Sequence, residues 1–250
     1  LADLRLPDET QPAQVGISIN MAVHPHYRGR GLVKKVAQPV YDTLTQCGVL
    51  AGVGFSNAEG VKVDQRSKGY GYQVLGQLQP LVARIRPFPT AVPLTLTDQL
   101  PNSLSIRTPV SQIMFDTTIQ GLHRRYGEHP FRCYRFAVWE EAGQVCGIVI
   151  YRPMKLLGIP AVALLGAYSD YLPTLLNGWL EAMHGQGYRL AHCLTSPAAP
   201  LRQQLQRLTL TFTPPYKRTP YYLTAKPLQA DLPADFLCFE QWNCVGGDVR

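Results

Sequence analysis

The residues best suited to bind an anion form a glycine- and arginine-rich segment near the start of the chain, Arg28-Gly29-Arg30-Gly31. This segment follows a β-branched run that ends at His24-Pro25, and it leads into residues with helical periodicity. Glycine lets a backbone approach a ligand closely, and the first N–H groups of a helix have no acceptor within the helix. Two guanidinium groups beside such N–H groups favour a phosphate or pyrophosphate. The sequence therefore predicts a phosphorylated ligand at residues 28–33.

Regular elements must hold this segment in place, and apolar periodicity predicts an alternation of strands and helices. In the first part of the chain we expect strands over 15–23, 49–55 and 72–78, and helices over 31–46 and 58–68. The inward face of the helix over 31–46 should carry its apolar residues: Leu32, Val33, Val36, Ala37, Val40, Tyr41 and Leu44.

The same alternation returns after residues 84–104, a proline-containing stretch that indicates a linker. We expect a helix over 110–126, a hairpin of strands 134–139 and 145–152, a strand over 161–167, a helix over 173–184, a strand over 189–195 and a helix over 200–208. In the helix over 173–184, the inward residues should be Leu176, Leu180 and Met183. The chain is thus predicted to be α/β, with two units of similar architecture.

Composition narrows the class of protein. The 250 residues carry a net charge of +7, which favours an anionic partner. Lysine and arginine are dispersed rather than clustered, which argues against nucleic acid. The six cysteines form no C-x-x-C pair and, like the histidines, show no metal-ligand spacing, so we expect reduced thiols, no metal and a cytoplasmic protein. We see no bilayer-spanning apolar run and no signal peptide.

Two other phosphate-binding motifs do not fit the segment. The dinucleotide fingerprint G-x-G-x-x-G would need a glycine where Lys34 stands. A P-loop would need G-K-S/T, which the sequence lacks.

Arg28-Gly29-Arg30-Gly31-Leu32-Val33, after a strand ending Ala22-Val23-His24-Pro25, resembles the Q/R-x-x-G-x-G/A loop of the GNAT (N-acetyltransferase) superfamily. The resemblance continues through Gly54-Phe55-Ser56-Asn57 and Gly71-Tyr72, and a weaker second match begins at residues 122–136. It implies a GNAT-like mixed sheet of α+β type, with two GNAT-like units in tandem. The implied units are residues 1–86 and 105–250, joined by a linker over 87–104.

The resemblance also implies a cofactor, acetyl-CoA or another acyl-CoA. The residues that it assigns to the cofactor are Ala22, Val23, Arg28, Gly29, Arg30, Gly31, Leu32, Val33 and Asn57. The implied activity is N-acylation of a primary amine on a small molecule or sugar. Two alternatives stay open: a non-catalytic CoA-binding or interaction subunit, and aminoacyl transfer of the cell-wall type. The oligomeric state also stays open.

The sequence departs from the superfamily pattern in ways that leave the catalytic residues unknown. Val33 stands where the loop prefers Gly or Ala, and Ser67 takes the place of the usual tyrosine acid, with Tyr70 nearby. The strand over 15–23 contains no carboxylate base. Only residues 1–14 precede this strand, where the superfamily normally has strands and helices that build the acceptor cleft. Three alternatives stay open: the chain is longer and the first unit is truncated here, the second unit supplies that wall, or the acceptor site is absent. The matching turn of the second unit, residues 166–170, has no basic residue, and we expect it not to bind CoA.

Overall fold

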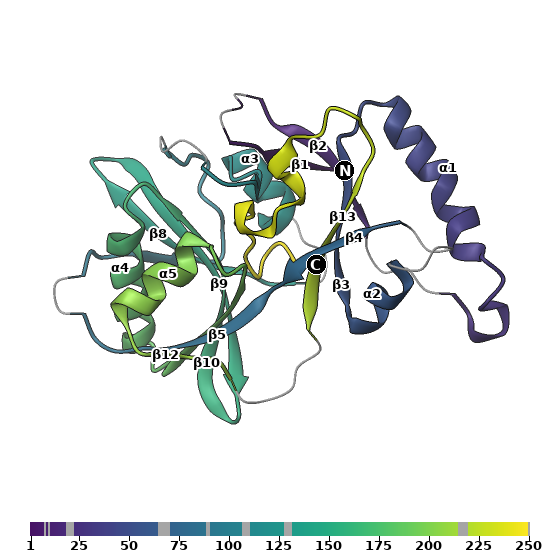
Figure 1. The fold of residues 1–250 in the computed structure, drawn as a ribbon. Helices are drawn as coiled ribbons and strands as arrows, with labels where there is room; N and C mark the ends of the chain where they lie inside the picture. Colours follow the sequence, from purple (N-terminus) through teal and green to yellow (C-terminus); the bar gives the residue numbers. More distant parts are fainter. Residues whose placement is uncertain are drawn as a thin grey trace.

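Two mixed β-sheets, each flanked by helices, make up the structure (Figure 1), which is a computed structural model. It describes residues 1–7, 9, 11–18, 23–64, 71–88, 91–106, 111–127, 132–214 and 220–249. Among these residues, no helix is both long and apolar enough to cross a membrane.

The first sheet has the strand order β4-β13-β3-β2-β1-β7. Its strands are β1 (Ala2–Arg5), β2 (Ala13–Ser18), β3 (Ala51–Asn57), β4 (Gln73–Gln77), β7 (Met114–Phe115) and β13 (Tyr221–Pro227). The parallel pair β2–β3 is joined by α1 (Leu32–Gln46), and α2 (Ala58–Asp64) follows β3. The helix expected over 31–46 is therefore confirmed.

The second sheet has the strand order β12-β5-β11-β10-β9-β8-β6. Its strands are β5 (Gln79–Arg84), β6 (Thr95–Thr97), β8 (Arg135–Glu141), β9 (Gln144–Leu156), β10 (Ile159–Ser169), β11 (Leu190–Thr195) and β12 (Thr211–Phe212). The parallel pair β10–β11 is joined by α4 (Leu172–Gly185), and α5 (Pro200–Leu208) follows β11. Short helical turns complete the chain: α3 (Ile119–Leu122), η1 (Pro25–Tyr27), η2 (His123–Gly127), η3 (Ala234–Leu237) and η4 (Phe239–Gln241).

The two sheets contain the same series of elements, strand-helix-strand-helix-strand, and the strand that follows each series lies in the other sheet. β2-α1-β3-α2-β4 in the first sheet corresponds in order to β10-α4-β11-α5-β12 in the second. The strand after each series crosses over: β5 lies between β11 and β12, and β13 lies between β3 and β4. The expected unit 1–86 thus places β5 in the second sheet, and the expected unit 105–250 places β7 and β13 in the first. Part of the expected linker is also a strand, since β6 pairs with β8.

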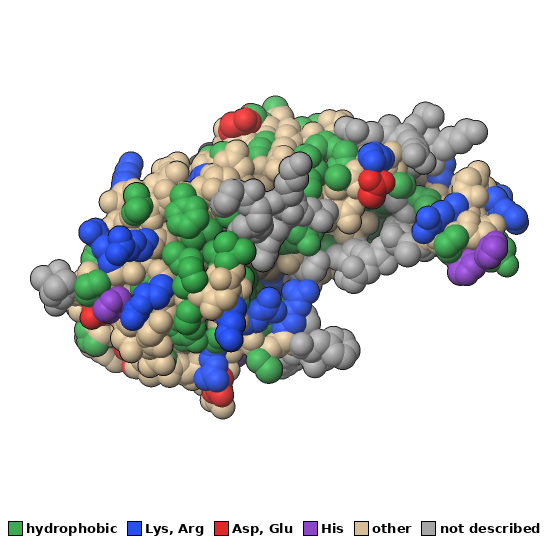
Figure 2. All heavy atoms as spheres, turned by 90° about the horizontal axis from the view of Figure 1, so that it is seen from below, with side chains coloured by type: hydrophobic (Ala, Val, Ile, Leu, Met, Phe, Trp, Pro, Cys, Tyr) green, Lys and Arg blue, Asp and Glu red, His purple; other side chains and the backbone are tan. Residues whose placement is uncertain are grey.

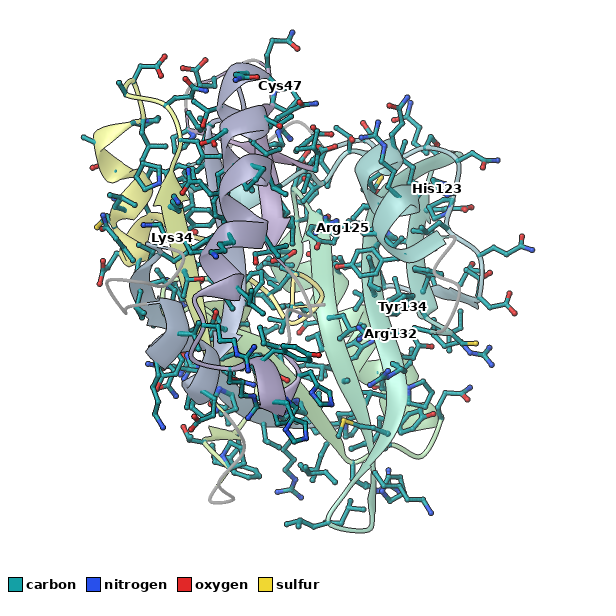
Figure 3. The ribbon with its side chains drawn as sticks, turned by 90° about the vertical axis from the view of Figure 1, so that its right-hand side faces the viewer. Lys34, Cys47, His123, Arg125, Arg132 and Tyr134 are labelled. Atoms are coloured by element: carbon teal, nitrogen blue, oxygen red, sulfur yellow. The ribbon has the colours of Figure 1, made fainter. Side chains whose placement is uncertain are left out.

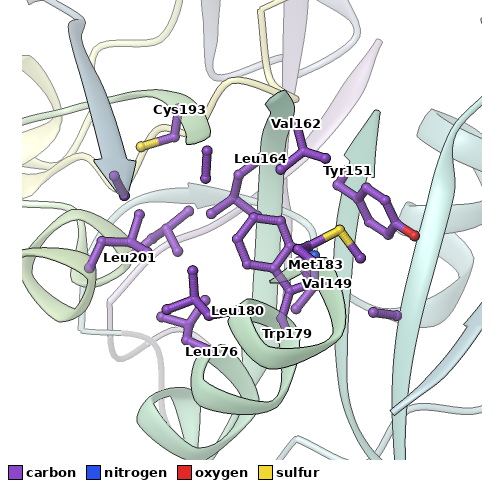
Figure 4. Packing of buried hydrophobic residues seen from close by; sticks show 14 of the residues in the cluster. Val149, Tyr151, Val162, Leu164, Leu176, Trp179, Leu180, Met183, Cys193 and Leu201 are labelled. Atoms are coloured by element: carbon purple, nitrogen blue, oxygen red, sulfur yellow. The ribbon is translucent and has the colours of Figure 1, made fainter. Parts of the chain in front are cut away.

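Apolar side chains between α4, α5 and the second sheet form the largest core cluster (Figure 4). Trp179, Leu176, Leu180 and Met183 of α4 are fully buried there, against strand residues such as Leu164. The predicted inward face of this helix is confirmed. Because so much apolar surface leaves water, this half is a rigid support for the turns at the ends of its strands.

Two sequence predictions are wrong. On α1, Ala37 and Tyr41 are buried as expected, but Val36 and Val40 are 66% and 54% exposed, because the helix rests on its sheet along a narrow contact. The helix expected over 110–126 begins only at Ile119. Thr118 caps it by accepting a hydrogen bond from the N–H of Gly121, and Met114–Phe115 before it is strand β7. Apolar spacing alone did not separate the strand from the helix.

Candidate cofactor-binding site

The loop between β2 and α1 is held in a fixed shape by its own backbone. Its 3₁₀ turn η1 is closed by hydrogen bonds from the N–H of Tyr27 to the carbonyl of His24 (2.9 Å) and from the N–H of Arg28 to the carbonyl of Pro25 (3.2 Å). The Arg28 Nε donates to the carbonyl of Val23 at 3.1 Å. This contact fixes the start of the arginine side chain and leaves its two terminal nitrogen atoms for another partner.

Two glycines shape the end of this loop. Gly29 and Gly31 have φ angles of +77° and +68°, a left-handed conformation that side chains rarely adopt. A Cβ placed on either residue would meet no atom within 4 Å, so both face open space. Gly31 is the N-cap of α1 and offers no side-chain cap. Among the described residues, the N–H groups of residues 29–34 have no backbone acceptor, which leaves them available to a ligand.

Cationic residues stand next to these N–H groups in the chain. Arg30 lies with its guanidinium carbon 5.3 Å from the ring centroid of Tyr27, and the first turn of α1 contains Lys34 and no acidic residue. Figure 2 shows Lys, Arg and His side chains gathered at the right-hand end of the molecule, where this loop projects. The positive end of the helix dipole, the free N–H groups and the cations all favour an anion at this place.

Val33 packs against the small cluster that Ala37 and Tyr41 of α1 form with Tyr72. Its side chain therefore has a packing role on the inner side of α1. Only its backbone N–H is offered to the loop, as the resemblance requires.

Asn57, the last residue of β3, has a visible structural role. Its Oδ1 accepts a hydrogen bond from the N–H of Gly60 at 2.8 Å and so caps α2. The side-chain NH₂ group still offers two donors. Of the other residues considered from the sequence, Ala22, Ser67 and Tyr70 lie outside the described residues.

Lys226 is a residue that sequence reasoning missed. It lies on the exchanged strand β13, and its Nζ is 4.0 Å from the ring centroid of Tyr41 on α1. Partial burial, together with the charge of Lys34, lowers the pKa of Lys226. Figure 3 shows Lys34 on α1. No local signal could have found this contact, because it depends on a strand from the far end of the chain.

The β2–α1–β3 connection of the first sheet has an equivalent in the second sheet, where α4 joins β10 to β11. We call these connections the first and second crossovers. The second crossover is closed by the C-terminal segment, residues 244–248. Parallel pairing of β10 and β11 ends at Leu164 and Cys193, although both strands continue. The C-terminal segment enters the space between them. The N–H of Gly247 donates to the carbonyl of Leu165 (2.9 Å), the N–H of Ser196 donates to the carbonyl of Cys244 (3.0 Å), and Val245 bridges Thr195.

A buried ion pair anchors this segment. Arg125 Nη1 donates to Asp248 Oδ1 at 2.6 Å, and both side chains are less than a tenth exposed. The other carboxylate oxygen accepts from the N–H of Val245 at 2.8 Å. Burial opposes the charge of Arg125, but Tyr126, Tyr168 and Asp248 together hold its pKa above the ordinary value. Figure 3 shows Arg125 in the interior of the molecule.

The turn from β10 into α4 also lacks the features of the first loop. Residues 169–172 are Ser-Asp-Tyr-Leu, with one acidic and no basic side chain, and Pro173 stands in the first turn of the helix. Proline has no N–H, so one of the donors that a helix start normally offers is missing. The second crossover is therefore poorly suited to a phosphate.

Known proteins resemble this chain in structure alone. No family model and no curated protein matches the sequence. A GCN5-related N-acetyltransferase from Anabaena variabilis ATCC 29413 has a TM-score of 0.59 at 12% identity, over 88% of this chain and 56% of its own. The chain has the GNAT fold. A second GNAT-fold match is a conserved protein of unknown function from Enterococcus faecalis V583, named a probable N-acyltransferase, with a TM-score of 0.55 at 14% identity. It covers 86% of this chain and 54% of its own, so this GNAT-fold chain spans little more than half the length of either structure.

Proposed function

We propose that the β2–α1 loop binds acetyl-CoA or another acyl-CoA, and that the chain is an N-acyltransferase for a primary amine of a small molecule or sugar. One observation carries the proposal: a left-handed glycine caps α1, and the free N–H groups there stand among cations with no acid in the first turn. The GNAT fold of the chain supports the same assignment. A cytoplasmic location is part of the proposal, supported by six free cysteines.

Each predicted residue has a place in this arrangement. The N–H groups of Gly29, Gly31, Leu32 and Val33 bind the pyrophosphate oxygens. The guanidinium groups of Arg28 and Arg30 balance the charge of those oxygens. Sequence resemblance further places Ala22, Val23 and Asn57 along the pantetheine arm.

Bound acyl-CoA supplies a thioester whose carbonyl carbon an amine can attack. The amine nitrogen forms the new C–N bond, the C–S bond breaks, and the CoA thiolate takes up a proton while the amine loses one. The backbone N–H near Val23 donates a hydrogen bond to the thioester carbonyl oxygen and stabilises the charge that develops there. A water-mediated base removes the amine proton. The loop contributes by holding the pyrophosphate and thereby orienting the thioester.

Acetyl transfer tests this proposal. Wild-type protein is incubated with acetyl-CoA and a panel of primary amines and amino sugars, and free CoA thiol is measured. We expect thiol release that depends on an amine, and loss of that release in the double variant Arg28→Ala/Gly31→Trp. The matched control, Arg207→Ala, removes an exposed arginine from α5 and should keep full activity. Amine-dependent release that survives in the double variant would contradict the role of the loop.

A second function, a CoA-binding subunit without catalysis, is favoured by one observation. Strand β2, residues 13–18, reads Ala-Gln-Val-Gly-Ile-Ser and holds no carboxylate to act as a base. Thiol release together with calorimetric titration of acetyl-CoA separates the two functions: a non-catalytic subunit binds acetyl-CoA but releases no thiol with any amine.

A further inference from the structure

The hairpin of β9 and β10 projects from the second sheet. β8 pairs with β9 only as far as Tyr151, and β11 pairs with β10 only from Ala161, so residues 152–160 extend past both neighbouring strands. The N–H of Arg189, just before β11, donates to the carbonyl of Pro160 at 3.0 Å. The hairpin points down in Figure 1, and Figure 2 views the molecule from that side. We call this surface the hairpin end; it comprises residues 84–86, 152–160, 189–190 and 210–212.

Large apolar side chains are exposed on both sides of the hairpin end. Leu157 and Ile159, at the tip of the hairpin, are 82% and 42% exposed. Leu210 and Phe212, at β12, are 67% and 43% exposed. The N–H of Arg84 on β5 donates to the carbonyl of Leu210 at 2.9 Å, which ties this side to the rest of the sheet. Because β12 and β10 are three strand spacings apart, the two apolar groups stand about 14 Å from each other.

Exposed cations lie between and beside these apolar groups. They are Arg84, Arg152, Lys155 and Arg189. The hairpin end contains no Asp or Glu, and neither do residues 215–219, which follow β12 outside the described ranges. Glu181 of α4 is a nearby acid, and it accepts a hydrogen bond from the N–H of Phe88. Figure 2 shows hydrophobic side chains interspersed with Lys and Arg over the left half of the molecule. Such a surface attracts a polyanion.

The turn of the hairpin holds its leucine at a cost. Leu157 and Gly158 have φ angles of +51° and +82°, both in the left-handed region. A hairpin turn of this kind favours Asn or Asp at its first position, and a bulky side chain there is strained. Leu157 gains little packing in return, because most of its side chain is in water. Strain without internal packing favours a contact with something outside the chain.

The hairpin of β8 and β9 provides an internal comparison at the opposite end of β9. Its turn residues, Ala142 and Gly143, have φ angles of +50° and +76°, so the backbone conformation is the same. The residues around them are Glu140, Glu141 and Gln144, which are acidic or polar. The turn conformation therefore requires neither a leucine nor cations. One end of the strand pair is acidic and the other is basic and apolar.

We propose that the hairpin end docks on a membrane surface rich in anionic phospholipid. Leu157 and Ile159 enter the boundary between headgroups and acyl chains, and the cations beside them contact lipid phosphates. Nucleic acid fits this surface less well, because unpaired bases stack on aromatic rings and the tip of the hairpin is aliphatic. The inference does not depend on the function proposed for the β2–α1 loop.

Co-sedimentation of the full chain with vesicles tests this docking. We expect the protein to sediment with vesicles of equal parts phosphatidylcholine and phosphatidylglycerol, and to stay in solution with phosphatidylcholine alone. Leu157→Asn should weaken binding about tenfold, because it removes the apolar side chain that enters the lipid. Asparagine suits the turn, so this variant should unfold at the same urea concentration or a higher one. The matched control is Ala142→Asn, which makes the same change in the acidic hairpin turn and should bind as the wild type does.

A second variant tests the charges. Lys155→Gln/Arg189→Gln should weaken binding at least about tenfold and reduce its dependence on salt. Three results would each overturn the proposal: no sedimentation with the anionic vesicles, equal sedimentation with both lipid compositions, or full binding by Leu157→Asn. Loss of binding in Arg28→Ala/Gly31→Trp would also overturn it, by placing the contact at the β2–α1 loop. Thiol release by Leu157→Asn should equal that of the wild type, so failure here leaves the acyltransferase proposal standing.

Discussion

The β2–α1 and β10–α4 crossovers join parallel strands in the same way but differ at the point where a ligand would approach. In the first, Gly29 and Gly31 turn the chain into α1, and the backbone N–H groups of residues 29–34, beside arginine and lysine, find no backbone acceptor in the described part of the chain. In the second, the strands separate at Leu164 and Cys193, and the chain's own C-terminal segment hydrogen-bonds in the space between them. One copy of the crossover is open to an anion and the other is closed by protein.

This difference shows how one fold can keep a scaffold while changing a site. In the closed crossover, the backbone groups at the strand ends hydrogen-bond to the C-terminal segment, which the buried Arg125–Asp248 ion pair holds in place. The open crossover has backbone conformations that only glycine adopts readily. Ordering a glycine on folding costs more backbone entropy than ordering other residues, and a bound ligand would offset this loss of stability.

Asp248→Asn should give the largest effect, because it leaves the Arg125 charge buried without its partner. We expect the free energy of unfolding to fall by about 3–5 kcal/mol, measured by urea unfolding. The control is Asp3→Asn, which breaks the Asp3–Arg124 pair, where the arginine side chain is 67% exposed. Loss there should be about 0–1 kcal/mol. Equal losses in the two variants would show that the C-terminal segment is not anchored as described.

Gly31→Ala should reduce stability by about 1–2 kcal/mol, because a Cβ is strained in the left-handed region. The open space around Gly31 means that no steric clash adds to this cost. The control is Gly185→Ala in the last turn of α4, where space is also open and φ is not left-handed. There alanine should raise stability by up to about 1 kcal/mol. Urea unfolding of both variants measures the contrast, and a neutral Gly31→Ala would argue against the left-handed cap.

Thiol reactivity should distinguish the exposed end of α1 from the buried C-terminal segment of the closed crossover. Cys47, next to the end of α1, is exposed, whereas Cys244 of the C-terminal segment and Cys193 of β11 are buried. Burial raises the pKa of the Cys193 thiol to about 12 and that of Cys244 well above its usual range. Since the thiolate is the reactive form, iodoacetamide at pH 8 should modify the exposed Cys47 before Cys193 and Cys244, which stay unmodified until the chain unfolds. Mass spectrometry of peptides measures the order, and early modification of Cys244 would mean that the closed crossover opens.

The sequence predicts most of what is local and little of what is long-range. Helix 31–46 and the hairpin of β8 and β9 follow from spacing and turn residues, and the Arg28–Gly31 loop follows from residue type alone. The exchange of β5 and β13 could not be predicted, because strand partners distant in sequence leave no local pattern. For the same reason, the approach of Lys226 to α1 and the insertion of the C-terminal segment beside Leu165 became visible only in the structure.

Calorimetric titration with acetyl-CoA tests the difference between the crossovers most directly, because it counts sites as well as measuring affinity. We expect one acetyl-CoA per chain, with binding abolished in Arg28→Ala/Gly31→Trp and retained in Gln204→Trp, which changes a residue of α5 in the second half of the fold. Two sites per chain, or a site that survives in the Arg28→Ala/Gly31→Trp variant, would contradict the account.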